Sequence, residues 1–253
     1  EMQINIEQVL STLEEIKSEV CQFIDSKMEN LDSLQVNIKE DSSPVTEIDL
    51  YISNCFKERF KNLYPKLNFY SEEDKEELQY PTIIIDPIDG TRELARGVGE
   101  CSISFGIYFS STFNDPRNFS WIFNPFNSLT AQTNSKSINS RLVKRKRLLG
   151  FVSNTEFNNG LYDDLSSDIT VIPKGSIAYK LGLLSKGICD FVITKKPKNI
   201  WDIMAGSHIC AQLDLITFID EKEVDRIDDE LINAPILWCR RENLENLRKE
   251  FQI

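Results

Sequence analysis

Two aspartates that follow an apolar run are the residues of this chain best placed to do chemistry. Residues 82–85 have the apolar character of a buried strand, and Asp86 and Asp89 follow them across a stiff proline turn. The two carboxylates therefore leave one strand end together, where the carbonyl of Ile88 could join them as an oxygen ligand of Mg²⁺. If the segment stood alone, an Asp-Gly turn with a helix cap would be the better explanation.

Gly90 and Thr91, which come next, suit the approach of an anion. Glycine lets a backbone come close to a ligand, and a helix starting at Thr91 would present free N–H groups beside the metal. A phosphate group needs this combination of cations and N–H donors. The segment therefore favours a phosphate site at the end of a strand.

Three further acids stand where a strand is expected to end or a helix to start. Glu72 follows an expected strand, Asp49 lies in the first turn of an expected helix, and Asp202 lies at the start of another. Each has an ordinary explanation by itself, namely an acidic loop for Glu72 and a helix cap for the two aspartates. In α/β folds, however, such positions converge on one crevice. Together the acids predict a shared metal-binding crevice.

The composition excludes several other kinds of site. The 253 residues include 40 acidic and 29 basic ones, and the net charge of −11 argues against general affinity for nucleic acid or an anionic membrane. His208 is the one histidine, which rules out a metal site with two histidine ligands. Its place inside an expected helix favours a structural role. The basic run 144–147 is better explained as a solvated loop or strand edge than as a nucleic-acid site.

The cysteines and the apolar runs bear on location. The six cysteines stand far apart without a C-x-x-C pair, so we expect reduced thiols and a cytoplasmic protein. No charged-then-apolar signal segment opens the sequence, and nowhere do 18 apolar residues run together. We therefore expect no association with a membrane.

The elements that must position these residues follow from the apolar spacing. Helices are expected over residues 6–27, from about residue 46, and over residues 176–186 and 202–213. Strands are expected at 67–71, 82–85, 101–109, 121–123, 148–153, 169–172, 189–194, 215–219 and 235–239. This order predicts a layered α/β protein. Its halves, residues 1–125 and 126–253, would form one compact unit, with a loop over residues 124–139 at the boundary.

The ordered set of acids resembles the inositol monophosphatase superfamily of lithium-sensitive, Mg²⁺-dependent phosphatases. The matching segments are Asp49, Glu72-Glu73, Asp86-Pro87-Ile88-Asp89-Gly90-Thr91 and Trp201-Asp202-x-x-Ala205-Gly206. Residues 39–49, 86–101 and 199–202 look most like the 3'(2'),5'-bisphosphate nucleotidase branch, in which Arg92-Glu93-Leu94 is the most telling part. Gly175-Ser176 with Lys180 is also similar to that branch. The resemblance implies a layered αβαβα sandwich. Residues 1–125 would carry most of the metal ligands, and residues 126–253 would carry Asp202 and substrate contacts.

The same resemblance implies a role for each residue. One metal would be held by Glu72, Asp86 and the carbonyl of Ile88, and another by Asp86, Asp89 and Asp202, with two or three Mg²⁺ per active site. Asp49 and Thr91 would orient and activate the attacking water with the help of Glu72, without a covalent intermediate. The residues implied in substrate binding are Ile88, Asp89, Gly90, Thr91, Ser176, Lys180 and Asp202.

Departures from the family pattern leave the substrate open. Residues 126–146 and 214–234 contain no glycine where family members carry hairpins, and the second of these segments is shorter than usual. Asn154 stands where the nucleotidase branch often has an arginine, so a basic substrate contact is missing. Lys195, Lys196 and Lys198 could meet a second substrate phosphate, or could equally lie in a solvated loop.

The expected activity is hydrolysis of the 3'-phosphate of adenosine 3',5'-bisphosphate to AMP by a Mg²⁺-dependent phosphomonoesterase. An inositol or sugar monophosphatase is the nearest alternative. A catalytically weak phospholigand-binding protein is an alternative of another class, which the complete acid set disfavours. The expected partner is a small phosphorylated substrate, neither nucleic acid nor membrane, and a homodimer is compatible with the sequence.

Overall fold

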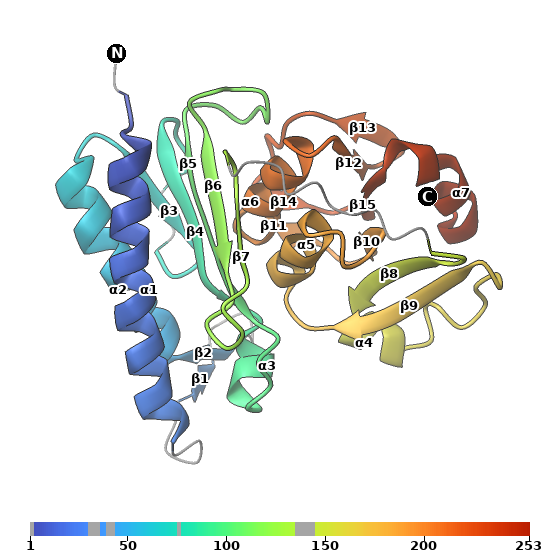
Figure 1. The fold of residues 1–253 in the computed structure, drawn as a ribbon, viewed down its shortest axis with the longest axis horizontal. Helices are drawn as coiled ribbons and strands as arrows, with labels where there is room; N and C mark the ends of the chain where they lie inside the picture. Colours follow the sequence, from blue (N-terminus) through green and yellow to red (C-terminus); the bar gives the residue numbers. More distant parts are fainter. Residues whose placement is uncertain (1–2, 30–35, 39–43, 75–76, 135–144) are drawn as a thin grey trace.

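Helices α1 and α2 cover one face of a five-stranded sheet, as the left side of Figure 1 shows. The computed structural model describes residues 3–29, 36–38, 44–74, 77–134 and 145–253. α1 (Ile6–Met28) and α2 (Glu47–Leu63) each turn an apolar stripe toward the sheet. Phe56 of α2, for example, packs against Phe105 with the ring centroids 5.0 Å apart. The spacing that predicted these helices is the spacing that buries them.

The first sheet has the strand order β3-β4-β5-β6-β7, in which β3 and β4 are parallel and the other pairs antiparallel. Its strands are β3 (Asn68–Ser71), β4 (Thr82–Asp89), β5 (Ser102–Tyr108), β6 (Phe119–Phe123) and β7 (Thr130–Gln132). Ile83 and Ile85 of β4 pack with α1 and α2, whereas Ile84 belongs to a core on the opposite face. A sheet that is apolar on both faces needs a cover on each.

Helices α5 (Ile177–Ser185) and α6 (Ile200–Ala211) supply the second cover and lie between the two sheets (Figure 1). The two helices approach closely at Gly206, where an added Cβ would lie 2.3 Å from Cδ1 of Leu181. The crossing therefore has no room for a side chain at this position. Because α6 also carries Asp202 in its first turn, the packing of α6 determines where that carboxylate lies.

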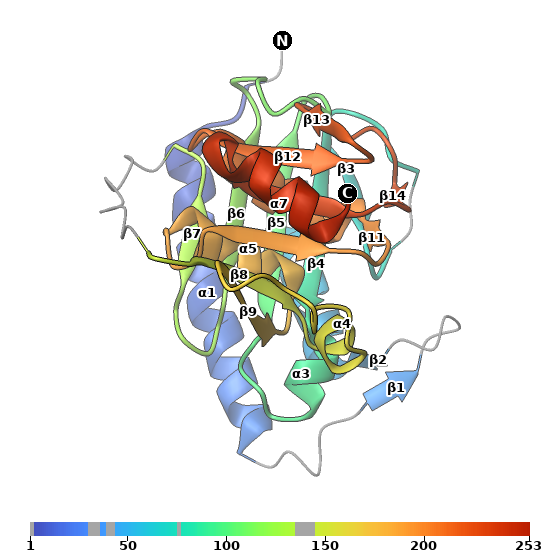
Figure 2. The same cartoon turned by 90° about the vertical axis from the view of Figure 1, so that its right-hand side faces the viewer.

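The second sheet has the order β13-β12-β15-β10-β8-β9. Its strands are β8 (Leu148–Ser153), β9 (Ile169–Lys174), β10 (Phe191–Thr194), β12 (Leu215–Ile219), β13 (Lys222–Val224) and β15 (Ile236–Arg240). α4 (Asn154–Asn158) follows β8 directly, and α7 (Leu244–Phe251) packs on the outer face through Leu247 and Phe251. Figure 2 shows α7 in front of these strands. Helix, sheet, helix, sheet and helix layers thus confirm the predicted αβαβα sandwich.

Short elements complete the described chain. They are β1 (Val36–Ile38), β2 (Pro44–Thr46), α3 (Thr91–Ala95), β11 (Lys198–Asn199), β14 (Leu231–Ile232) and the 3-10 helix η2 (Arg241–Asn243). β11 pairs with β14 in antiparallel fashion, so that Lys198 lies opposite Ile232. This pairing fixes the chain just before α6.

Every expected helix and strand is present, with differences in detail. The segment 124–139, predicted to be a loop, contains β7 in its described part, while residues 135–139 lie outside the described residues. The helix expected from Asp202 begins two residues earlier, because Asn199 is its N-cap. The hairpin of β12 and β13 forms without glycine, since Asp220 and Glu221 adopt the left-handed φ values of 48° and 62° that a two-residue turn requires.

The proposed halves are not separate in their packing. β7 lies beyond residue 125 and yet completes the first sheet. A division of the chain into two halves at residue 125 stays a prediction. In the part of the chain that is described, no helix has both the length and the apolar character needed to cross a bilayer.

Candidate active site

Three aspartates from two elements meet at one point between the layers. Carboxylate oxygens of Asp86, Asp89 and Asp202 all lie within 4.8 Å of one another. Asp86 is 1% exposed, and its Oδ1 receives no hydrogen bond from any described residue. A buried carboxylate without a partner is costly unless a cation covers it. The cluster therefore fits a divalent cation that prefers oxygen ligands.

An irregularity in β4 brings Asp86 and Asp89 to the same place. Residues three apart on a regular strand point to opposite faces. Here Asp86 lies opposite Ser104 and Asp89 opposite Ser102, and the register shifts between the two pairs. Such a bulge re-aims a side chain at a strand end. The proline turn between the aspartates is thus what lets both carboxylates face one ligand.

In the described part of the chain, the hydrogen bonds to Asp89 and to Asp202 each reach a single carboxylate oxygen. Oδ2 of Asp89 accepts hydrogen bonds from Ser176 Oγ at 2.7 Å and from the N–H of Ala178 at 2.6 Å. Oδ2 of Asp202 accepts one from the N–H of Asn199 at 2.9 Å, as part of a capping box. Partners that hold one oxygen and leave the other available are typical of metal-binding carboxylates.

The electrostatics of the cluster also fit the binding of a cation. Burial raises the pKa of Asp86 well above its usual value, and repulsion from Glu72, Asp89 and Asp202 raises it further. Burial, followed by repulsion from Asp89, raises the pKa of Asp202 to about 7, while Lys198 acts in the opposite direction. Without a cation, the folded protein therefore holds protons that the unfolded chain would release.

This proton binding predicts how stability depends on pH in the metal-free protein. Because the pKa of Asp202 is raised, its stabilising contribution is complete below about pH 4 and is lost as the pH rises through about 7. We expect the melting temperature of the chelator-treated protein to fall between pH 5 and pH 8, by about 2 to 4 °C for each kcal/mol lost. Thermal unfolding followed by circular dichroism would measure this.

Two comparisons make the test specific. Added Mg²⁺ should raise the melting temperature more at pH 8 than at pH 5, because the ion binds the deprotonated carboxylates. Asp202→Asn should flatten the pH dependence of the metal-free protein. A melting temperature that rises from pH 5 to pH 8 without metal would contradict the electrostatic description of this cluster.

Asp49 and Thr91 form a second pair beside the aspartates. Thr46 caps α2, and its N–H and hydroxyl both donate to Oδ2 of Asp49. Oδ1 of Asp49 accepts from the hydroxyl of Thr91 at 2.8 Å, and that hydroxyl also lies 2.9 Å from the carbonyl of Ile88. Burial raises the pKa of Asp49, against which the bonds from Thr46 and Thr91 act. The capping box thus fixes the carboxylate of Asp49 in a position where it accepts a hydrogen bond from the hydroxyl of Thr91.

A cavity of about 400 Å³ is lined by all the site residues that the sequence predicted, except Asp49, Ser176 and Lys180. Thr91 lines it while Asp49 lies behind, so the pair connects the cavity to a buried carboxylate. The lining residues are Glu72, Asp86, Ile88, Asp89, Gly90, Thr91, Arg92, Glu93, Lys198, Asn199 and Asp202. α3 does begin at Thr91, with Gly90 as its N-cap at a φ of 99°. A side chain at Gly90 would lie 2.9 Å from the carbonyl of Glu100, so the turn requires glycine.

An adjoining cavity of about 170 Å³ holds Ser176 and Lys180. The hydroxyl of Ser176 donates to Asp89, accepts from the N–H of Tyr179 at 2.9 Å and lies 3.0 Å from Ser102 Oγ, so its bonds orient Asp89. Lys180 is buried, and its Nζ donates to the carbonyl of Lys174 at 2.9 Å. Burial lowers its pKa to about 8. Substrate contacts of Ser176 and Lys180 stay predictions.

His208 and the described part of the basic run 144–147, for which the sequence favoured explanations other than a functional site, lie away from these cavities. Nδ1 of His208 lies 2.8 Å from Ser120 Oγ in the core, and burial lowers the pKa of this histidine to about 4, so it is neutral at physiological pH. In the basic run 144–147, residue 144 lies outside the described residues and Arg145 pairs with Asp190 at 3.0 Å. Residues 39–43 of the family motif are also outside the described chain.

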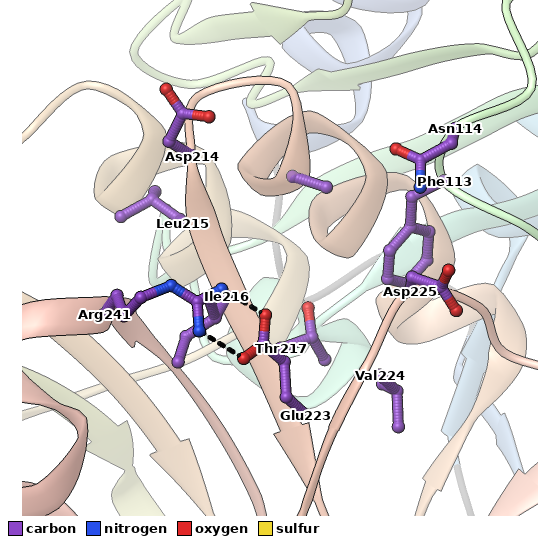
Figure 3. Close-up of a pocket in the computed structure, with 11 residues that line it drawn as sticks. Phe113, Asn114, Asp214, Leu215, Ile216, Thr217, Glu223, Val224, Asp225 and Arg241 are labelled. Atoms are coloured by element: carbon purple, nitrogen blue, oxygen red, sulfur yellow. Dashed lines mark hydrogen bonds and ion pairs between the residues drawn. The ribbon is translucent and has the colours of Figure 1, made fainter.

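A further cavity of about 250 Å³ lies at β12 and β13 and shares no lining residue with the acid cluster (Figure 3). The guanidinium of Arg241 bonds to Glu223 at 2.7 and 2.5 Å there. Thr217 lines the cavity, but its hydroxyl oxygen is buried away from solvent. This cavity is lined by none of the candidate catalytic residues, which lie at the two cavities beside the aspartates.

Sequence reasoning missed one buried acid near the smaller cavity. Glu156 of α4 is 0% exposed, and its carboxylate accepts four hydrogen bonds from the segments that follow β8 and β10. The signal for it is weak, because Ser153 and Glu156 have the spacing of a capping box and no feature of the sequence reveals the distant donors.

Comparisons with known proteins bear on the chemistry of this site. The model of the inositol monophosphatase family matches residues 5–252. The 3'(2'),5'-bisphosphate nucleotidase CysQ of Aggregatibacter actinomycetemcomitans is 22% identical over 85% of this chain and 82% of its own length. The CysQ of Haemophilus influenzae is 25% identical over 70% of this chain and 71% of its own.

Solved structures show the same fold. An inositol monophosphatase of Thermotoga maritima superposes with a TM-score of 0.74 at 20% identity, covering 98% of this chain and 97% of the other. A structure described as an IMPase/NADP phosphatase complexed with Mg²⁺ and phosphate superposes with a TM-score of 0.72 at 17% identity, over 97% and 95% of the two chains.

Proposed function

Because this chain belongs to the inositol monophosphatase family and is a hydrolase of phosphoric monoesters, we propose that it uses Mg²⁺ to release the 3'-phosphate of adenosine 3',5'-bisphosphate. The observation that supports metal binding is the carboxylate cluster, in which the buried Oδ1 of Asp86 accepts no hydrogen bond from the described residues. The observation that favours a bisphosphate is the cavity next to that cluster, which four basic residues line together with three acids. The relatives named CysQ agree with this choice.

In this proposal, acids from β4, from α6 and from the turn after β3 would hold the metal. Glu72, Asp86 and the carbonyl of Ile88 would bind one ion, and Asp86, Asp89 and Asp202 another. Divalent cations bound there supply charge that stabilises the transferring phosphoryl group and lower the pKa of bound water. The protein's own part is to fix the carboxylates in advance, which Ser176, Ala178 and Asn199 do through the hydrogen bonds to Asp89 and Asp202.

Thr91 and Asp49 would take up the proton that the attacking water loses. The hydroxyl of Thr91 donates to Asp49, so a lone pair of its oxygen remains to accept a hydrogen bond from water in the cavity. As the water loses its proton, the hydroxyl takes it up and passes its own proton to the carboxylate of Asp49. The raised pKa of Asp49 favours this transfer.

The substrate is tested by a phosphate-release screen in Mg²⁺. Adenosine 3',5'-bisphosphate, adenosine 3'-monophosphate, inositol 1-phosphate and a sugar phosphate would be compared by kcat/KM. A clear preference for the bisphosphate supports the nucleotidase assignment. A preference for inositol 1-phosphate would replace it with the monophosphatase alternative, which the neutral Asn154 favours.

Lithium should inhibit the reaction if the acid set binds metal as proposed. Li⁺ would compete with Mg²⁺ at one position of Asp86, Asp89 and Asp202, where its single charge stabilises the transition state less. We expect turnover at limiting Mg²⁺ to fall several-fold in LiCl and to recover as Mg²⁺ is raised. The same concentration of NaCl or KCl is the control for ionic strength. Equal effects of the three salts would argue against a lithium site.

Two expectations from the sequence concern the setting of the enzyme. A cytoplasmic location and a homodimer stay predictions, as does the number of Mg²⁺ ions. The six cysteines are free thiols, four of which are buried. A small phosphorylated molecule remains the proposed partner.

A further inference from the structure

Lys198 stands where the two cavities at the active site join. Arg92 and Lys198 are the cationic residues that line both of them. Lys198 follows the loop after β10 and comes four residues before Asp202. Among described residues its ammonium donates only to the carbonyl of Pro197, at 3.3 Å, next to it in the chain. An anion in the cavity could replace so weak and local a bond.

The other lysines of the smaller cavity are already engaged. Lys174 pairs with Glu100 at 3.1 Å, and Lys180 is buried with its ammonium against the carbonyl of Lys174. Asn154, at the position where the nucleotidase branch often has arginine, carries no charge and donates to Glu93 at 3.3 Å. Among the described residues, Lys198 is therefore a cation that lines this cavity together with Asp89 and Asp202 and makes no ion pair with an acid.

The backbone that carries Lys198 is fixed by the buried carboxylate of Glu156. Its Oε1 accepts from the hydroxyl of Thr194 at 2.9 Å and from the N–H groups of Lys195 and Lys196 at 2.8 and 2.9 Å. Its Oε2 accepts from the hydroxyl of Tyr162 at 2.6 Å. A carboxylate with so many donors holds a loop more firmly than neutral groups would.

On the other side of Lys198, the chain is held by a strand pair. Lys198 and Asn199 form β11, which pairs with β14, and the N–H of Ile200 donates to the carbonyl of Glu230 at 2.9 Å. The loop of residues 194–198 is thus fixed at both ends, by Glu156 and by β14. A fixed backbone presents a lysine at lower entropic cost when it binds a ligand.

We propose that Lys198 is the specificity residue that binds the anionic group of the substrate beyond the reacting phosphate, and that Glu156 is the positioning residue that holds its loop. The inference rests on the proposed function, since it identifies which residue would recognise the second phosphate of a bisphosphate nucleotide.

The test compares two substrates that differ only in the 5'-phosphate. For Lys198→Ala, we expect kcat/KM for adenosine 3',5'-bisphosphate to fall about 10- to 100-fold, mainly through KM, because a charge-assisted bond to phosphate is lost. For adenosine 3'-monophosphate, kcat/KM should fall by a clearly smaller factor, since this substrate has no second phosphate to lose. Lys196→Ala is the matched control, because it removes an exposed lysine of the same loop that lines neither cavity.

Glu156→Gln tests the positioning role with a variant of the same shape. We expect a smaller, about three- to tenfold, rise in KM for the bisphosphate, with kcat on the monophosphate unchanged. In the Lys198→Ala background the same change should have no further effect on KM for the bisphosphate, because the two residues act on one contact. A merely structural role would affect both substrates equally.

The outcomes separate this inference from the proposed function. A wild type that prefers the bisphosphate, with Lys198→Ala retaining that preference, overturns the role of Lys198 and leaves the function standing. Equal losses on both substrates also overturn it, because they place Lys198 at the reacting phosphate. A wild type without any preference for the bisphosphate overturns both.

Discussion

Asp86→Asn should leave a folded protein that has lost at least about 10³-fold in kcat, equivalent to about 4 kcal/mol of transition-state stabilisation. Asp86 is the residue through which both proposed metals would be bound, and in the described part of the chain its Oδ1 has no hydrogen-bond partner. An amide keeps the shape of the side chain but removes its charge. The loss should therefore appear with every phosphate ester tested, because it concerns the reacting phosphate.

The stability of the Asp86→Asn protein provides a readout that is independent of activity. Repulsion among the acids destabilises the metal-free wild type, so the variant should melt at a higher temperature in the presence of a chelator. Mg²⁺ should raise its melting temperature less than that of the wild type. Asp229→Asn, at an exposed position, is the control for loss of one negative charge. Near-normal turnover by Asp86→Asn would show that this cluster is not the catalytic centre.

Thr91→Val should have the second largest effect, a fall of about 10²- to 10³-fold in kcat with KM and the Mg²⁺-induced stabilisation nearly unchanged. Valine fills the same volume but has no hydroxyl, so the connection between the cavity and Asp49 is broken. The metal-binding carboxylates would remain in place. Steady-state kinetics with adenosine 3',5'-bisphosphate and thermal unfolding with Mg²⁺ would separate these effects.

Thr91→Ser is the matched variant, because it keeps the hydroxyl and should retain most of the activity. The pH dependence provides a further check, since Thr91→Val should lose the rise of kcat that reports deprotonation of Asp49. If Thr91→Val and Thr91→Ser had equal activity, the hydroxyl would have no part in moving the proton.

Local sequence patterns predicted much of the site because its geometry is largely local. Asp86 and Asp89 lie on one strand end, and the proline turn that aligns them is visible in the sequence. Thr46 and Asp49 have the spacing of a capping box, and so have Asn199 and Asp202. Such spacings specify the position of a carboxylate before any tertiary contact exists.

Other parts of the site depend on contacts between distant segments. Glu156 binds donors 38 to 40 residues further along the chain, which no local pattern shows. Whether Lys198 faces solvent or the cavity depends on the pairing of β11 with β14. β7 has three residues and too little alternation to be recognised, and it exists because β6 offers it an edge. In each case tertiary context determines the outcome.

The close crossing of α5 and α6 has a mechanical consequence for the chemistry. The start of α5 holds Asp89 through Ser176 and Ala178, and α6 carries Asp202 one helical turn before Gly206. The distance between the two helices at this crossing therefore determines the distance between these two carboxylates. A methyl group at Gly206 would force the helices apart within about 6 Å of the site. A substitution at Gly206 should thus disturb the proposed metal site from a distance, although this residue lines neither cavity.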